Sequence, residues 1–134
     1  LEDCNQEIHL ERRDVCRGLP LESGSADVII ANYLFDILDE NETHKLIAEL
    51  YRILSPGGTI YISNICPGRT TFSTISMYMW KLIFQIWPKL VGFCKPVALE
   101  KNFHHPKWEV NTKNLSSLGI SSQVIIAQKV LAKV

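Results

Sequence analysis

An uninterrupted apolar run, Val28 to Ala31, stands out in the pattern of hydrophobic and polar positions along this chain. β-Branched residues dominate the run, and no polar residue alternates with them. Such a run is typical of a strand covered on both faces, as in a parallel sheet flanked by helices. Polar groups follow at Asn32-Tyr33, where the strand should end, and open α/β sheets bind ligands at that edge. The simpler interpretation is a buried strand followed by an ordinary loop.

A helix is expected after this strand. Asp39 can cap it, with Glu42 three residues later as the reciprocal partner. Apolar residues at helical spacing then form one stripe: Leu46, Ile47, Leu50, Ile53 and Leu54. Ser55–Gly58 should end the helix, and Thr59–Asn64 is again typical of a strand. Strand, helix, turn and strand in this order predict a βαβ unit with parallel strands.

The flanking segments give weaker patterns. Polar and apolar residues alternate over Glu7 to Arg13, which predicts a strand with one wet face near a sheet edge. Helical periodicity predicts a helix over Thr74–Trp87, and a short helix is expected over Lys107–Leu118, ended by Gly119. Residues 121–134 are rich in Val and Ile and predict one long strand, or two strands without a marked turn.

Composition and charge exclude several classes of function. The 134 residues are 46% hydrophobic and 21% charged, which is typical of one globular domain. Fourteen basic and fourteen acidic residues give no net charge, so no nucleic-acid partner is expected. The four cysteines include no Cys-x-x-Cys pair, so neither a zinc site nor a disulfide framework is indicated. No secretory signal or uninterrupted membrane span is visible, and we expect a cytoplasmic location.

Three motifs together resemble the class I S-adenosylmethionine-dependent methyltransferases, especially the branch that methylates quinones, lipids and other small molecules. In chain order they are Arg13-Asp14-Val15 with Leu19-Pro20-Leu21, then Ser25–Asn32, then Leu50–Gly58. They are similar to the segment after the family's third strand, to its fourth strand, and to the turn into its fifth strand. The resemblance extends over residues 8–64, which is about half of the chain.

This resemblance implies an α/β fold, with a Rossmann-like, doubly wound and mostly parallel sheet flanked by helices. The chain would be a single partial domain. Residues 1–64 would form the cofactor-side βαβ portion, and residues 65–134 the substrate-side helices and the C-terminal strand. Counting back along the family's pattern places Leu1 just before the third strand, so we expect the first two strands to be absent.

The resemblance also implies S-adenosylmethionine as the cofactor, with Asp14 and Val15 as adenine contacts. A carboxylate at a strand end can accept a hydrogen bond from the adenine amine, worth about 1.5–3 kcal/mol where water is excluded. Val15 can meet a ring nitrogen through its N–H, and Val15 and Leu19 can sandwich the ring. Asn32 falls where the cofactor meets the substrate. The alternatives are a turn-forming Asp14 and an Asn32 that only caps its loop.

Two parts of the family's cofactor site have no counterpart in this sequence. These are the Gly-rich loop after the first strand and the acidic residue that holds the ribose, since no glycine here forms Gly-x-Gly. We therefore expect this chain alone to bind the cofactor weakly or not at all, and to be inactive. No catalytic residue is assigned. Tyr33 and Asp36 are the polar side chains near the reacting edge that merit testing as orienting or base groups.

The second half of the chain is rich in aromatic residues. The segment Trp80–Trp87 could line a pocket for a hydrophobic acceptor, contact a membrane surface, or pack on the sheet. His104 and His105 are adjacent, without a third ligand at metal-binding spacing, so a surface loop is expected there and no metal site.

The predicted function is transfer of the sulfonium methyl to an oxygen, nitrogen or carbon atom of a small, hydrophobic acceptor. The alternative is a non-catalytic half-domain that acts as a binding module. The sequence does not indicate the oligomeric state.

Overall fold

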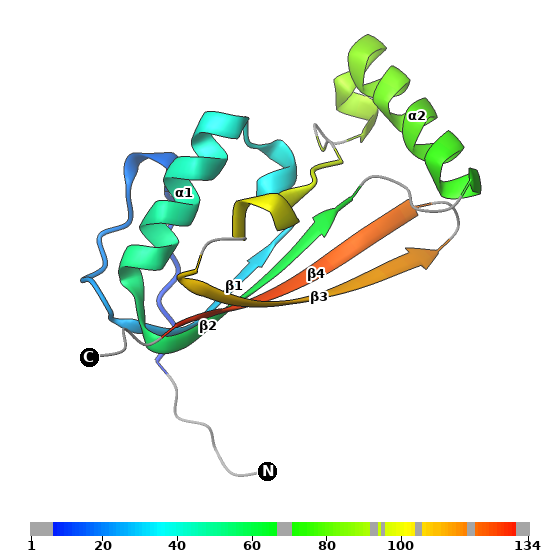
Figure 1. Ribbon diagram of the computed structural model, residues 1–134. Helices are drawn as coiled ribbons and strands as arrows, with labels where there is room; N and C mark the ends of the chain where they lie inside the picture. The colour runs from blue at the N-terminus through cyan, green and yellow to red at the C-terminus, as the bar shows by residue number, and fades with distance from the viewer. Residues whose placement is uncertain are drawn as a thin grey trace, which may run out of the picture.

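The computed structural model describes residues 7–66, 71–91, 94, 96–103, 106–117 and 120–130. A four-stranded sheet of order β1-β2-β4-β3 lies at its centre (Figure 1). The strands are β1 (Ala26–Asn32), β2 (Leu54–Ile65), β3 (Trp108–Ser117) and β4 (Ile120–Lys129). β1 and β2 are parallel, whereas β4 pairs antiparallel with both β2 and β3. The α/β fold is confirmed, but the sheet is mixed rather than mostly parallel.

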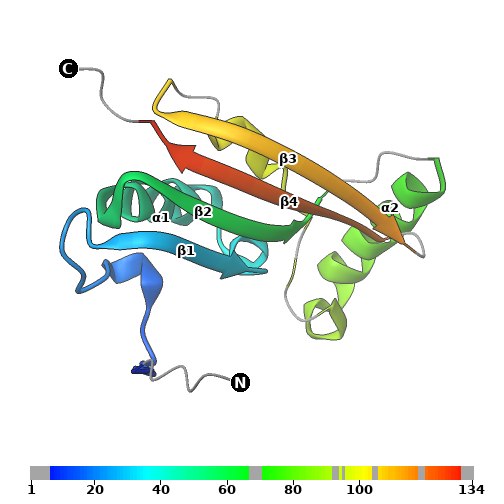
Figure 2. The ribbon, with the colours of Figure 1, turned by 90° about the horizontal axis from the view of Figure 1, so that it is seen from below.

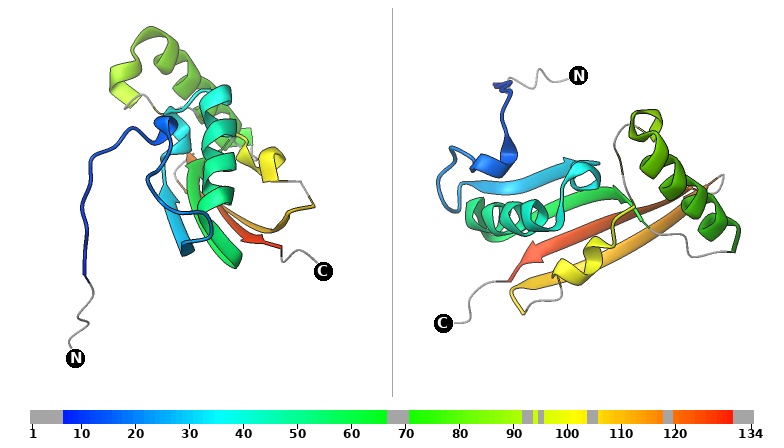
Figure 3. Two further views of the ribbon diagram at one scale, coloured as in Figure 1. Left: turned by 90° about the vertical axis from the view of Figure 1, so that its left-hand side faces the viewer. Right: turned by 90° about the horizontal axis from the view of Figure 1, so that it is seen from above.

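Two α-helices accompany the sheet, α1 (Glu40–Ile53) and α2 (Thr71–Ile86). The described residues also include four short 3₁₀ helices: η1 (Val15–Arg17), which precedes β1, and η2 (Phe35–Ile37), η3 (Pro88–Val91) and η4 (Leu99–Phe103) in the connections. α1 and η4 cover one face of the sheet, as the view from above shows (Figure 3). α2 lies beyond the carboxyl ends of β1 and β2 (Figure 2).

The predicted βαβ unit is present as β1, α1 and β2. Asp39 begins α1 with a capping box, because its carboxylate accepts from the Glu42 N–H at 2.8 Å while the Glu42 carboxylate accepts from the Asp39 N–H at 2.9 Å. The apolar stripe of the helix, Leu46, Ile47, Leu50 and Ile53, is buried against the sheet. The local sequence signals therefore place α1 over the face that becomes the core.

β2 follows α1 directly at Leu54, and two glycines lie in its first residues. Gly57 has a φ of +80°, a conformation that glycine adopts without strain. At Gly58, a Cβ would lie 2.9 Å from the Ser55 Oγ and 3.0 Å from the Asp27 carbonyl oxygen. The pairing with β1 shifts here, from Ala26–Leu54 to Val28–Thr59. The Pro-Gly-Gly turn thus lets β2 leave the helix and run close beside β1.

The core lies on one face of the sheet only. Ile60, Ile62 and Ile125 point toward α1 and are fully buried. On the other face, Val28 is 59% and Ile30 is 68% exposed, and no helix of the described residues covers them (Figure 2). The expectation that this strand is covered on both faces is therefore wrong. β1 is an edge strand, and the described chain provides no layer over its second face.

Two predicted elements differ in the structure. Glu7 to Arg13 is not a strand: Ile8 is 80% and Leu10 92% exposed, and the segment runs away from the sheet (Figure 3). Alternation alone does not make a strand when no partner strand pairs with it.

The helix expected over Lys107–Leu118 is instead β3, since its pairing with β4 from Trp108–Lys129 to Ser117–Ile120 outweighs a weak helical pattern. The strand expected after residue 120 is confirmed as β4, and the helix expected over Thr74–Trp87 is confirmed as α2.

Candidate active site

Val15 and Leu19, two of the residues expected around adenine, line one hollow of about 540 Å³. Its wall is formed by His9, Glu11, Arg13, Val15, Leu19, Pro20 and Leu21. Val15 and Leu19 are partly buried against the core, so the apolar part of this wall is anchored to the fold. A hollow of this size is in the range of ligand pockets, and its two apolar side chains suit the faces of a flat ring.

α1 holds the Leu19 loop in place with one ion pair. The Glu49 carboxylate accepts from the Leu19 N–H at 2.9 Å, and Arg52 donates to the Leu19 carbonyl oxygen at 3.2 Å. Arg52 and Glu49 lie 2.6 Å apart. The hydrogen bonds from Arg52 and from the Leu19 N–H lower the pKa of Glu49 to about 2, so it is charged at neutral pH. The predicted cofactor loop is thus fixed by residues far along the chain.

Asp14 makes local contacts in the structure. One carboxylate oxygen accepts from the Cys16 N–H at 3.1 Å and so caps η1, while the other lies 3.1 Å from the Arg17 guanidinium. The turn-forming alternative for Asp14 is therefore present. Its ion pair is exposed and contributes little, which leaves the second oxygen accessible to another donor. The adenine contact assigned to Asp14 stays a prediction.

Asn32 and Tyr33 lie at the carboxyl end of β1. Tyr33 has a φ of +53°, the one positive φ outside glycine among the described residues, and its N–H donates to the Ser63 carbonyl oxygen at 2.7 Å. Such a conformation in a bulky residue is uncommon and is often found at functional sites. Asn32 is exposed beside it and is not part of the Val15–Leu19 hollow. Asp14 does not line this hollow either, so Val15 is the one predicted cofactor contact of the three that does.

Asp36 is a fully buried carboxylate just beyond this edge. Both of its oxygens accept from the Ile65 N–H at 3.1 Å, which ties η2 to the end of β2. Burial raises the pKa of Asp36 to about 6, only partly offset by that hydrogen bond, and no described Lys or Arg pairs with it. Burial also raises the pKa of the Cys94 thiol, and the charge of Asp36 adds to this shift. A carboxylate that titrates near neutrality suits proton transfer or orientation.

A buried polar pair that the sequence analysis missed lies at the same end of β2. Asn64 and Gln123 are paired across β2 and β4 and are both buried. Asn64 donates to the Val97 carbonyl oxygen at 2.8 Å, and Gln123 donates to Asn114 at 3.2 Å. The side-chain oxygens of both residues are buried without a hydrogen-bond partner among the described residues. The one sequence signal was an asparagine in line with the apolar Ile60 and Ile62.

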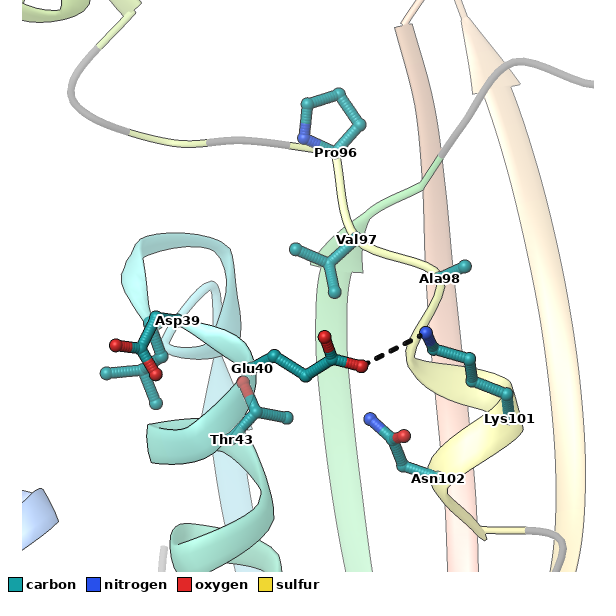
Figure 4. Close-up of a pocket in the computed structure, with 9 residues that line it drawn as sticks. Asp39, Glu40, Thr43, Pro96, Val97, Ala98, Lys101 and Asn102 are labelled. Carbon is teal, nitrogen blue, oxygen red and sulfur yellow. Dashed lines mark ion pairs between the residues drawn. The ribbon is translucent and has the colours of Figure 1, made fainter.

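A second, smaller hollow of about 230 Å³ lies between the start of α1 and the segment that precedes η4 (Figure 4). Its wall consists of Leu38, Asp39, Glu40, Thr43, Pro96, Val97, Ala98, Lys101 and Asn102. Glu40 and Lys101 reach across it and lie 3.6 Å apart. The Val97 N–H donates to the Ile65 carbonyl oxygen at 2.8 Å, so this segment is joined to the end of β2.

Metal ligands were not expected, and the described ranges contain no group of three or more His, Cys, Asp or Glu side chains suited to a metal ion. His104 and His105 lie outside the described residues.

The fold is that of Rossmann-like methyltransferases. It is similar to an S-adenosylmethionine-dependent methyltransferase from Archaeoglobus fulgidus, with a TM-score of 0.67, 17% identity, and coverage of 94% of this chain and 70% of that chain. A second such enzyme, from Methanosarcina mazei, gives a TM-score of 0.63 with 16% identity, covering 88% of this chain and 66% of that one.

Sequence comparisons also match methyltransferases. Residues 2–62 match the sequence model of a family described as methyltransferase domain. Phosphoethanolamine N-methyltransferase 1 of Triticum aestivum is 31% identical over 70 residues, which are 48% of this chain and 14% of that protein. This chain is therefore similar to methyltransferases in sequence over residues 2–62, just under half of its length, and in fold over most of its length. It spans only a small part of the wheat relative and about two thirds of the Methanosarcina structure (66%).

Proposed function

We propose that this protein transfers a methyl group from S-adenosylmethionine to a small acceptor with a hydrophobic body. The observation that carries the proposal is the hollow lined by Val15 and Leu19, which the Glu49–Arg52 pair fixes to α1. The apolar walls of this hollow suit a nucleoside base. The residues present therefore fit the adenosine end of the cofactor.

Three residues would hold that end. Val15 and Leu19 would contact the faces of the base, and the Asp14 oxygen now paired with exposed Arg17 would accept from the exocyclic amine. The other Asp14 oxygen would continue to cap η1 through the Cys16 N–H. Because the cap fixes the carboxylate before binding, less conformational freedom is lost when the base arrives.

The bound cofactor supplies an electrophilic sulfonium methyl, so the protein's main tasks are positioning and exclusion of water. Asn32 and Tyr33 would orient the acceptor at the carboxyl end of β1. Asp36 would act through them as a positioning residue, because it is buried and fixes η2 to β2. The name of the wheat relative makes an amine one acceptor class to test beside quinones and lipids.

The direct test is calorimetric titration of the full-length gene product with S-adenosylmethionine. Leu19→Asp should weaken binding at least about tenfold because it places a charge against the base, and Asp14→Ala should weaken it by about tenfold through the lost hydrogen bond. Leu115→Asp, a change at an exposed position on β3, is the matched control and should leave the affinity unchanged. Absence of binding, or full affinity in both site variants, would contradict the proposal.

A non-catalytic binding module is the second candidate, favoured by one observation. The outer edge of β1 is unpaired among the described residues, and Val28 and Ile30 are exposed beside it. An edge of this kind accepts a further strand. In that case the gene product would bind a polypeptide partner through β1 and would show no heat with S-adenosylmethionine.

A further inference from the structure

Helix α2 and the 3₁₀ helix η3 expose an apolar surface that the proposed function does not use. Six exposed residues define this surface, here termed the α2 apolar face: Ile75, Met79, Leu82, Ile83, Ile86 and Leu90. They recur at spacings of three and four residues, which place them along one side of the helix. Ile86 is 77% exposed, and no described side chain of α2 is buried. Contiguous apolar surface of this kind marks an interaction site.

The opposite side of α2 attaches the helix to the protein. Trp80 and Phe84 are half-buried there, one helical turn apart. The Trp80 indole N–H donates to the Cys94 carbonyl oxygen at 3.1 Å, which fixes the rotation of the helix about its axis. The helix stands away from α1, beyond the end of the sheet (Figures 1 and 2). The α2 apolar face is therefore directed outward rather than toward the core.

The charges on this segment have one sign. Residues 71–91 contain Lys81 and Lys89 and no Asp or Glu, although the chain as a whole is neutral. Both lysines are exposed. Lys81 lies at the border of the apolar face, where it shares a small hollow with Tyr78, Leu82 and Gln85. Tyr78 and Trp87 are also exposed, and such amphipathic rings favour the boundary between water and lipid.

The α2 apolar face could be covered by a second copy of this chain, by a small ligand or by a lipid surface. A second copy packed face to face would bring lysines together without an acidic partner. The hollow at Lys81, of about 180 Å³, is below the size range of small-molecule pockets. No helix among the described residues is long and apolar enough to cross a bilayer, so α2 would lie in the plane of the surface. We propose that the α2 apolar face binds the surface of an anionic lipid bilayer, with its apolar side chains among the acyl chains and its lysines at the phosphates.

Co-sedimentation of the chain with vesicles tests this proposal. Binding is expected to phosphatidylcholine vesicles that contain phosphatidylserine, and it should weaken at high salt. The double variant Ile86→Ser/Trp87→Ser should lose at least about tenfold in affinity, because Ile86 of the apolar face and the exposed Trp87 next to it in the sequence no longer insert. Lys81→Glu/Lys89→Glu should lose about tenfold or more on anionic vesicles and little on neutral ones. Val28→Ser/Ile30→Ser is the matched control, with equally exposed apolar residues on the sheet, and should bind as the unchanged chain does.

Three outcomes would overturn the proposal. They are no vesicle binding by the unchanged chain, equal loss in the control variant, and a concentration-dependent dimer that Ile86→Ser/Trp87→Ser abolishes in the absence of lipid. Circular dichroism should show all variants folded, since each substituted side chain is exposed. The proposal is independent of cofactor binding, because α2 contributes no residue to the Val15–Leu19 hollow.

Discussion

Apolar residues lie on both faces of the sheet, in opposite surroundings. On one face Ile60, Ile62 and Ile125 are fully buried beneath α1 and η4. On the other, Val28 and Ile30 are equally apolar and largely exposed. Hydrophobicity alone thus does not decide burial; the presence of a second layer does. The sequence of β1 is typical of a strand between two layers, and the described chain provides one of them.

The largest expected difference between the faces is in stability. Ile62→Ala should lower the free energy of unfolding by about 2–5 kcal/mol, because it removes buried methyl groups and leaves a cavity. Ile30→Ala, the matched change on the open face, should alter it by less than about 0.5 kcal/mol. Denaturant unfolding of the two variants measures both values. A large loss for Ile30→Ala would mean that β1 is covered in solution, for instance by a second copy.

The same contrast explains which elements the sequence could predict. α1 and its neighbours carry short-range signals: the Asp39–Glu42 capping box, a helical apolar stripe, and the Pro-Gly-Gly turn. β3 was mistaken for a helix because a strand formed by pairing with β4 leaves no strong local pattern. The opposite error occurred at Glu7 to Arg13, which was predicted as a strand from its alternating pattern but has no partner strand among the described residues.

The residues of the candidate site also differ in whether the sequence could predict them. Val15 and Leu19 were found through a motif, and the structure places both in one hollow. Nothing local indicated that Glu49 and Arg52 would hold Leu19, or that Asn64 and Gln123 would meet, because these contacts depend on packing and strand register. Asp14 shows the limit of a motif, since the same residue type serves a turn and a ligand equally well.

The buried carboxyl group of Asp36 provides a test that depends on pH. Its pKa is raised from 3.8 to about 6, so the folded protein holds this proton more tightly than the unfolded chain does. The stability that this contributes is complete below pH 3.8 and is lost as the pH rises through about 6. In Asp36→Asn that loss should be absent. From low to neutral pH, the unfolding free energy of Asp36→Asn should therefore rise by up to about 3 kcal/mol relative to that of the unchanged protein.

The pKa of Glu49 is shifted in the opposite direction to that of Asp36. Its pKa is lowered, so its contribution is present above the ordinary value of 4.5 and is lost as the pH falls toward 2. Comparing Asp36→Asn with the unchanged protein at each pH cancels the Glu49 effect, because both proteins retain it. A difference that does not vary between pH 4 and 7 would show that the Asp36 carboxyl is not desolvated.

The smallest expected effect concerns the cap that begins α1, the helix that makes one face buried. Asp39→Ala removes the acceptor for the Glu42 N–H and should cost about 1 kcal/mol. Asp39→Asn keeps an acceptor oxygen and should cost only a few tenths of that, measured by thermal unfolding of both variants. If Asn and Ala were equally harmful, the charge near the helix N-terminus rather than the hydrogen bond would be the main contribution. If neither changed stability, α1 would be held over Ile60 and Ile62 by its apolar stripe alone, and burial of this face would not depend on how the helix begins.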